Sequence, residues 1–186
     1  MKRTFTALCA CVFATLMLGC ASTKKGDVVA GSAAYKQALA DGFSEEAAHW
    51  VKRGAWTGKF EGEKGVFGTG YAAYANEQNS LRAARLHARR ELAEYLGTQM
   101  VTYSDETSND DASNAAQQIK GGDTGLANKL LVGSMQIDSY KHKNGEIHVL
   151  MFISEENLKA GFEDAGLKQI GYEILARLAE TNEDEL

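Results

Sequence analysis

The sequence predicts an α+β fold in which one long helix covers a small antiparallel sheet. Three observations lead to this fold class. Side chains alternate over 64–75 as in a strand, apolar residues recur at helical spacing over 80–100, and 133–153 has the pattern of a β-hairpin. One strand and one hairpin make three strands. We therefore expect a three-stranded antiparallel sheet with the helix on one face, and further helices towards the C-terminus.

The chain divides into four segments. We predict a lipoprotein signal peptide at 1–19, a lipidated N-terminus and tether at 20–43, an α+β domain at 44–166, and a C-terminal amphipathic helix with an acidic tail at 167–186. The domain is long enough to bury a core of its own. At its start, Ser44 is a helix N-cap, which predicts a short helix over 45–52, and Trp50 and Trp56 are expected to cover one end of the core.

The leader has the pattern of a bacterial lipoprotein signal. Lys2 and Arg3 precede an uncharged run that ends in Gly19 and Cys20. This pattern predicts cleavage between Gly19 and Cys20 and acylation of Cys20. A second possible cleavage motif ends at Cys11, but it leaves too short an apolar region for a signal peptide. The other alternative is an uncleaved membrane-spanning helix, because the uncharged run reaches roughly 20 residues. Ala21 and Ser22, not Asp, come directly after Cys20. This favours the outer membrane of a Gram-negative cell, with the domain facing the periplasm or the cell surface.

Composition excludes several classes of function. Removal of the leader takes the formal net charge from −5 to −7, and an acidic protein binds nucleic acid poorly, so no nucleic-acid partner is expected. All three cysteines lie at or before Cys20. The mature fold is therefore expected to hold no disulfide and no thiolate metal site, and no cofactor beyond the covalent lipid.

The strand predicted over 64–75 contains several glycines. Val66, Gly68, Gly70 and Ala72 share one face of this strand. A phosphate-binding loop is not indicated, because there is neither a Gly-x-Gly-x-x-Gly motif nor a Gly-Lys-Ser/Thr motif. Glycine inside a strand instead lets another element approach closely, so we expect the helix to lie against these positions.

The helix predicted over 80–100 carries the candidate binding residues. Its apolar stripe consists of Leu81, Ala84, Ala88, Leu92, Tyr95 and Leu96, and Asn79 or Ser80 is expected to cap it. Four arginines lie off or beside that stripe: Arg82, Arg85, Arg89 and Arg90. They form either a partner face for an acidic protein or lipid phosphate, or an ordinary solvated helix face.

The region after this helix is polar and lacks a metal motif. Residues 102–111 are acidic, but their order does not match a calcium-binding loop, so we predict a solvated loop. A weaker helical region over 112–132 is interrupted at Gly121-Gly122.

Two helices are predicted at the C-terminal end. Ser154 caps the first, which stops near Gly166. The apolar spacing over 167–178 predicts the last helix, which either packs on its own domain or forms a partner face.

The hairpin over 133–153 is centred on Asn144-Gly145, the preferred sequence of a two-residue type I′ turn. That turn pairs His142 with Ile147. His142 and His148 then lie on opposite faces of the sheet and cannot share an ion, so no metal site is expected.

Several short elements together resemble the twenty-kilodalton outer-membrane lipoprotein family. They are the leader, the strand Val66-Phe67-Gly68-Thr69-Gly70, the helix with Ala88-Arg89 and Glu91-Leu92-Ala93, the Leu131-x-Gly133 element and the strand pair. The resemblance implies a β-α-β-β domain with a dodecin-like fold and no enzyme activity. It also implies kinship with surface antigens and with flagellum-associated outer-membrane proteins that multimerise into disk-like structures.

The sequence thus favours a non-enzymatic function. We expect a lipid-anchored structural or interaction protein of the outer membrane, with a homo-oligomeric or an envelope-protein partner and an association with the motility apparatus. The alternative is a lipoprotein binding module that activates an envelope enzyme such as a cell-wall synthase. No catalytic residue is predicted, and no Gly-x-Ser-x-Gly motif is present.

Overall fold

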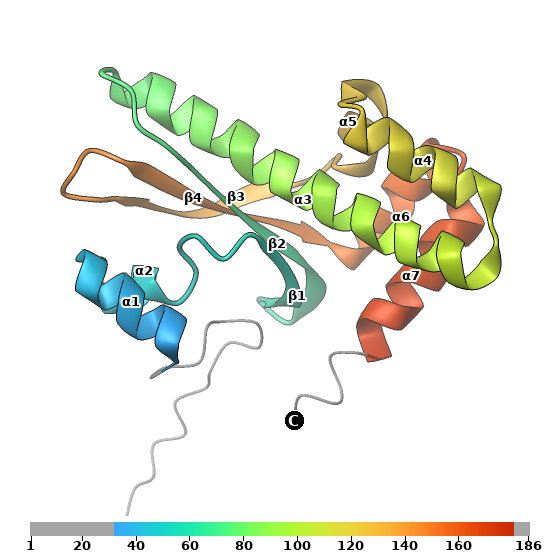
Figure 1. Cartoon of the computed structure of the whole chain (residues 1–186), viewed down its shortest axis with the longest axis horizontal. Coiled ribbons are helices and arrows are strands. Elements are labelled where there is room, and N and C mark those ends of the chain that lie inside the picture. The colour runs from blue at the N-terminus through green and yellow to red at the C-terminus, as the bar shows by residue number, and fades with distance from the viewer. Residues whose placement is uncertain (1–31, 181–186) are drawn as a thin grey trace, which may run out of the picture.

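The computed structural model describes residues 32–180 (Figure 1). The leader with Gly19, the first half of the predicted tether (20–31, which includes Cys20) and residues 181–186 of the acidic tail lie outside the described residues. The elements follow in this order: α1 (Ala33–Asp41), α2 (Glu45–Ala48), β1 (Ala55–Phe60), β2 (Glu63–Ala72), α3 (Glu77–Thr107), α4 (Asp110–Lys120), α5 (Thr124–Leu130), β3 (Met135–Lys141), β4 (Ile147–Ser154), α6 (Glu155–Asp164) and α7 (Lys168–Glu180).

The fold class is α+β, as predicted, but the sheet has four antiparallel strands in the order β1-β2-β4-β3 rather than three. The additional strand is β1, which pairs with β2 through a two-residue turn at Glu61 and Gly62. Both turn residues have positive φ, 51° and 89°, as a type I′ turn requires. The structure does not match the predicted three-stranded, dodecin-like β-α-β-β domain in detail, because α4 and α5 stand between α3 and β3 and because β1 extends the sheet at one edge.

Helix α3 lies on the face of the sheet that carries the strand glycines, as predicted. A Cβ atom at Gly68 would lie 2.6 Å from Cγ of Leu92, and one at Gly70 would lie 2.9 Å from the carbonyl carbon of His87. Glycine therefore sets how closely the helix approaches β2. Ala84, Ala88 and Leu92 are fully buried in this contact.

The long helix extends further than predicted at both ends. Asn76, rather than Asn79 or Ser80, is its N-cap, and its side chain accepts the amide of Asn79. The solvated loop predicted over 102–111 is wrong, because α3 continues to Thr107 and α4 begins at Asp110. Burial of Met100 and Tyr103 explains the extension, since these residues continue the apolar stripe into the C-terminal half of the helix.

Helices α4 to α7 gather around that C-terminal half of α3 (Figure 1). The interruption at Gly121-Gly122 separates α4 from α5, and Ser154 caps α6 by accepting the amide of Asn157, both as predicted. The last helix packs on its own domain. Its apolar residues Ile170, Ile174, Leu175 and Leu178 are buried in the core that α3 shares with the sheet.

The opposite face of the sheet is also covered, although the prediction left it open. Residues 33–41, predicted as part of a tether, form α1 with Ser32 as N-cap, and the short α2 follows. This segment buries Phe43 and Trp50 against Trp56, Phe67 and Phe152 of the sheet, in a second apolar core. The domain therefore begins before residue 44, and its layers are helix, sheet and N-terminal segment.

The β3–β4 hairpin has a different register from the predicted one. The amide of His142 bonds to the carbonyl of Glu146, and the amide of Gly145 to the carbonyl of His142. Three residues thus form the loop, with Gly145 in the left-handed region at φ 92°. Tyr140 consequently pairs with His148, so His142 and His148 lie on the same face of the sheet, not on opposite faces.

Candidate functional site

The four predicted arginines of α3 divide into two pairs. Arg85 donates from Nε to Oε1 of Gln136 over 2.6 Å, and Arg89 donates to Oγ of Ser134 over 2.8 Å. These contacts connect α3 to the start of β3 through neutral acceptors, and Arg89 also reaches Oδ1 of Asn128 at 3.4 Å. The two guanidinium groups are therefore held in fixed positions while their charge remains available to a partner.

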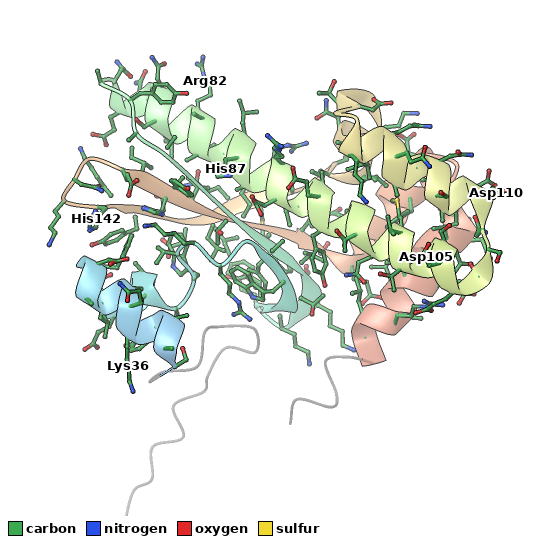
Figure 2. All side chains as sticks on the ribbon, in the orientation of Figure 1. Lys36, Arg82, His87, Asp105, Asp110 and His142 are labelled. Atoms are coloured by element: carbon green, nitrogen blue, oxygen red, sulfur yellow. The ribbon has the colours of Figure 1, made fainter. Side chains whose placement is uncertain are left out.

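The other two arginines are exposed. Arg82 lies near the N-terminal end of α3 (Figure 2). Arg90 pairs with Glu94 one turn further along, with 2.6 Å between Nε and Oε1, and this carboxylate raises the pKa of Arg90. Exposed pairs of this kind contribute little to stability. The structure thus brings Arg85 and Arg89 to the junction with β3 and leaves Arg82 and Arg90 on the solvated side.

A groove runs beside Arg89 and Arg90, between α3 and the α4–α5 turn. Its volume is about 440 Å³, and it is lined by Leu86, Arg89, Arg90, Lys120 and Leu131 together with neighbouring residues of α4 and α5. The side chain of Leu86 is 64% exposed although it is a large apolar residue. Glu94 and Asp123 also line the groove, so its charged groups are mixed, with three basic and two acidic side chains. This lining around an exposed leucine fits a partner segment that is partly apolar and carries more acidic than basic side chains.

Leu86 and Lys120 are not among the residues predicted from the sequence. A signal was available for Leu86, because it is a leucine opposite the apolar stripe of α3 and therefore faces away from the sheet. Lys120 comes into the groove only because α4 folds back along α3, a contact between distant segments that local patterns do not reveal.

Charge is distributed unevenly along α3. Arg82, Arg85, Arg89 and Arg90 lie in its first half, whereas Asp105 lies in its last turn and Asp110 begins α4 (Figure 2). Asp110 and Asp111 occupy the first turn of α4, where carboxylates interact favourably with the helix dipole. The molecule therefore presents a basic region and an acidic region at opposite ends of one helix.

The two hairpin histidines form a separate cluster around Phe43. The Phe43 ring stacks on His142 at 4.6 Å and lies edge-on to His148 at 4.9 Å. His148 is 1% exposed, and burial lowers its pKa below the ordinary histidine value despite Glu146, whose Oε2 lies 3.5 Å from Nε2. Within residues 32–180, no group of three or more His, Cys, Asp or Glu side chains is placed to hold a metal ion.

The predicted lipidation and cleavage residues, Cys20 and Gly19, are outside the described part of the chain. Among the helices of that part, none is both long enough and apolar enough to cross a membrane.

No protein-family model matches the chain, and no curated protein matches it. One similar solved structure is the crystal structure of a hypothetical protein from Francisella tularensis, with 18% sequence identity and a TM-score of 0.37. The match covers 63% of this chain and 44% of that protein, so the chain spans less than half of the length of its structural neighbour.

Proposed function

We propose that the protein is a lipid-anchored, non-enzymatic interaction protein of the outer membrane, and that it self-associates through α3. The lipoprotein pattern ending at Cys20 supports the anchor and the location. The resemblance to the twenty-kilodalton outer-membrane lipoproteins supports a multimeric envelope role, with association with the motility apparatus as its most specific form.

The observation that carries the proposal is the charge distribution along α3. The basic first half borders a groove with an exposed leucine, and the acidic residues Asp105 and Asp110 lie at the far end. Because the two regions differ, a contact between them joins the head of one copy to the tail of the next. Such a heterologous contact generates a ring when its rotation closes and a filament when it does not.

The two kinds of group in the groove have different roles in such a contact. Burial of Leu86 contributes affinity, since full burial of a leucine side chain is worth about 1.5–3 kcal/mol. The exposed arginines contribute orientation and association rate, and their effect weakens as salt screens the charges. We therefore expect an assembly that dissociates partly at high ionic strength.

Charge reversal tests the contact directly. Arg90→Glu and Asp105→Lys are each expected to lower the molar mass measured by light scattering after size exclusion, because each places like charges across the interface. The double variant is expected to restore assembly. Lys36→Glu in α1 is the matched control, since Lys36 is exposed and lies far from α3 in Figure 2. A monomeric wild-type protein at all concentrations would refute self-association.

The anchor has a test of its own. Cys20→Ala is expected to move the protein from the membrane fraction to the soluble fraction, because the acylated thiol is lost. Retention in the membrane would favour the uncleaved leader instead.

Cross-linking from position 86 in intact cells distinguishes the proposed role from its alternative. Recovery of a second copy of the chain supports self-association. Recovery of a cell-wall synthase or another envelope enzyme in place of a second copy favours the activator function, for which the same groove offers an exposed leucine between basic and acidic side chains.

A further inference from the structure

The N-terminal segment 32–53, here called the strap, covers the aromatic face of the sheet. Its buried side chains include Phe43, Ala47 and Trp50. Beneath them Trp56 stacks on Phe67 with 5.2 Å between ring centroids, and further aromatic side chains continue this face. In the sequence, the strap stands between the predicted lipidation residue Cys20 and β1. Displacement of the strap would uncover the apolar surface beneath it.

The contact beneath the strap is incompletely satisfied. Among the described residues 32–180, Nε1 of Trp50, Nε1 of Trp56 and Nδ1 of His148 are buried ring nitrogens without a hydrogen-bond partner, whereas Nε2 of His148 faces Oε2 of Glu146 at 3.5 Å. Buried polar atoms of this kind destabilise the state that buries them, because water would hydrate each of them once exposed. The closed position of the strap is therefore weaker than its apolar area suggests.

The end of the strap contains a strained hinge. Lys52 has a φ of 57° and Gly54 a φ of 81°. Left-handed backbone is readily adopted by glycine but strained for lysine, so release of the strap would relieve strain at Lys52. Beyond this hinge, the amide of Gly54 donates to Oγ1 of Thr69 and the amide of Thr69 to the carbonyl of Gly54, which fixes the chain to β2.

The far end of the strap is fastened by the histidine cluster. Nε2 of His142 donates to the carbonyl oxygen of Asp41 over 3.0 Å, and Nδ1 accepts the amide of Asn144 over 3.5 Å. The Phe43 ring lies against both histidines. The fastening thus joins the strap to both histidine rings in one buried site.

The charged groups around His148 come from several elements. Glu146, before β4, favours its protonation, whereas Lys52 of the strap and His142, which follows β3, oppose it. Tyr71 of β2 stacks on His148 at 5.5 Å, and His87 of α3 lies beyond it, 5.2 Å from the Tyr71 ring. Desolvation is the largest influence and opposes the charged form while the strap is closed.

We propose that the strap is a releasable cover, and that protonation of His148 opens it and exposes the aromatic face of the sheet. The closed site holds His148 neutral, whereas an open strap lets water solvate the imidazolium. Because the open state binds a proton at a higher pH than the closed state, acidification through the ordinary histidine pKa, about 6.5, favours opening. The open-to-closed ratio rises about tenfold per pH unit until the closed state is protonated as well.

The chain contains two tryptophans, and both report on this contact. Trp50 belongs to the strap and Trp56 to the sheet face beneath it, and they are 4% and 7% exposed. The experiment follows tryptophan emission and acrylamide quenching of the full-length protein in detergent from about pH 7.5 to about pH 5, with far-ultraviolet circular dichroism in parallel. Opening predicts a red shift and stronger quenching while the helical signal persists.

Three variants make the test specific. Trp50→Phe leaves Trp56 alone, so a persisting red shift shows that the sheet face itself becomes exposed. His148→Phe keeps the ring and removes the titrating group, and is expected to abolish the transition. His49→Phe, which preserves a ring against Tyr35, is the matched control and is expected to retain it.

Emission that stays constant over the pH range would overturn the proposal. It would also be overturned if the helical signal were lost in the same transition, or if His148→Phe responded to acid as the wild type does. The proposal is independent of self-association through α3, and the spectroscopic assay can be carried out on a monomer.

Discussion

Replacement of Gly70 by alanine tests whether glycine sets the distance between α3 and the sheet. A Cβ atom at this position would lie 2.9 Å from the carbonyl carbon of His87 and closer still to the carbonyl oxygen of Ala84 and the amide nitrogen of Ala88. All three atoms belong to the α3 backbone, so no side-chain rotation relieves the contact. The helix or the strand must move instead.

The size of the effect follows from that geometry. Normal contact between carbon atoms needs about 3.5–4.0 Å, so the two elements must separate by about 1 Å. Overpacking of a core costs about 1–3 kcal/mol, and the rigid backbone partners place Gly70→Ala at the upper end, about 3 kcal/mol. For a domain of this size, that loss corresponds to a decrease in Tm of about 6–12 °C.

Gly62→Ala is the matched control on the same hairpin. Gly62 has a φ of 89°, but a Cβ atom there would meet nothing within 4 Å. The substitution therefore carries only the cost of left-handed backbone, about 1 kcal/mol. Urea unfolding monitored by circular dichroism measures both variants. If Gly70→Ala lost no more stability than Gly62→Ala, close approach of α3 would not be what requires glycine in β2.

Two further predictions concern α3. Ser80→Ala is expected to lower the free energy of unfolding by about 1–2 kcal/mol, because the fully buried Ser80 hydroxyl accepts the amide of Tyr74 over 2.8 Å and donates to a backbone carbonyl. Denaturant unfolding would measure this loss, and an unchanged midpoint would contradict the prediction. Glu94→Ala is expected to change stability by less than about 0.5 kcal/mol, since it breaks only the exposed pair with Arg90; a larger loss in the same assay would show that this pair is structurally important.

The features predicted correctly from the sequence are those that depend on local spacing. The stripe through Ala88 and Leu92 identified the buried face of α3, and the period of two in β2 placed Gly68 and Gly70 beneath that helix. Ser154 was identified as a cap because its side chain needs only the amide three residues later. Each of these patterns depends only on residues that lie within a few positions of one another along the chain.

The missed elements are stabilised by distant contacts. The nine-residue α1 is rich in alanine but too short to be stable alone, and the six-residue β1 is an edge strand. Both are held by the second apolar core, in which Phe43 and Trp56 pack across the sheet. The hairpin register failed for a different reason. Asn144-Gly145 is compatible with either a two-residue or a three-residue loop, and a shift of one residue exchanged the face of His148 relative to His142.

The candidate site was only partly predictable. The arginine cluster was visible in the sequence, but the acceptors of Arg85 and Arg89 are 51 and 45 residues away, in a segment whose position depends on the whole fold. The groove likewise requires α4 to return along α3. Local patterns thus identified the charged residues but not which of them are held in place and which remain exposed.

The pairing of the two central strands has a consequence for how the chain assembles. The outer pairs, β1–β2 and β3–β4, are hairpins with short turns, whereas β2 and β4 join residues from Ala72 with Ile147 to Gly65 with Ser154, between 75 and 89 positions apart. Local hairpins and helices form early, and a pairing across so long a segment must wait for chain closure. Because α3 directly follows β2 and packs on it, this unit offers the returning hairpin a preformed template for the central pairing.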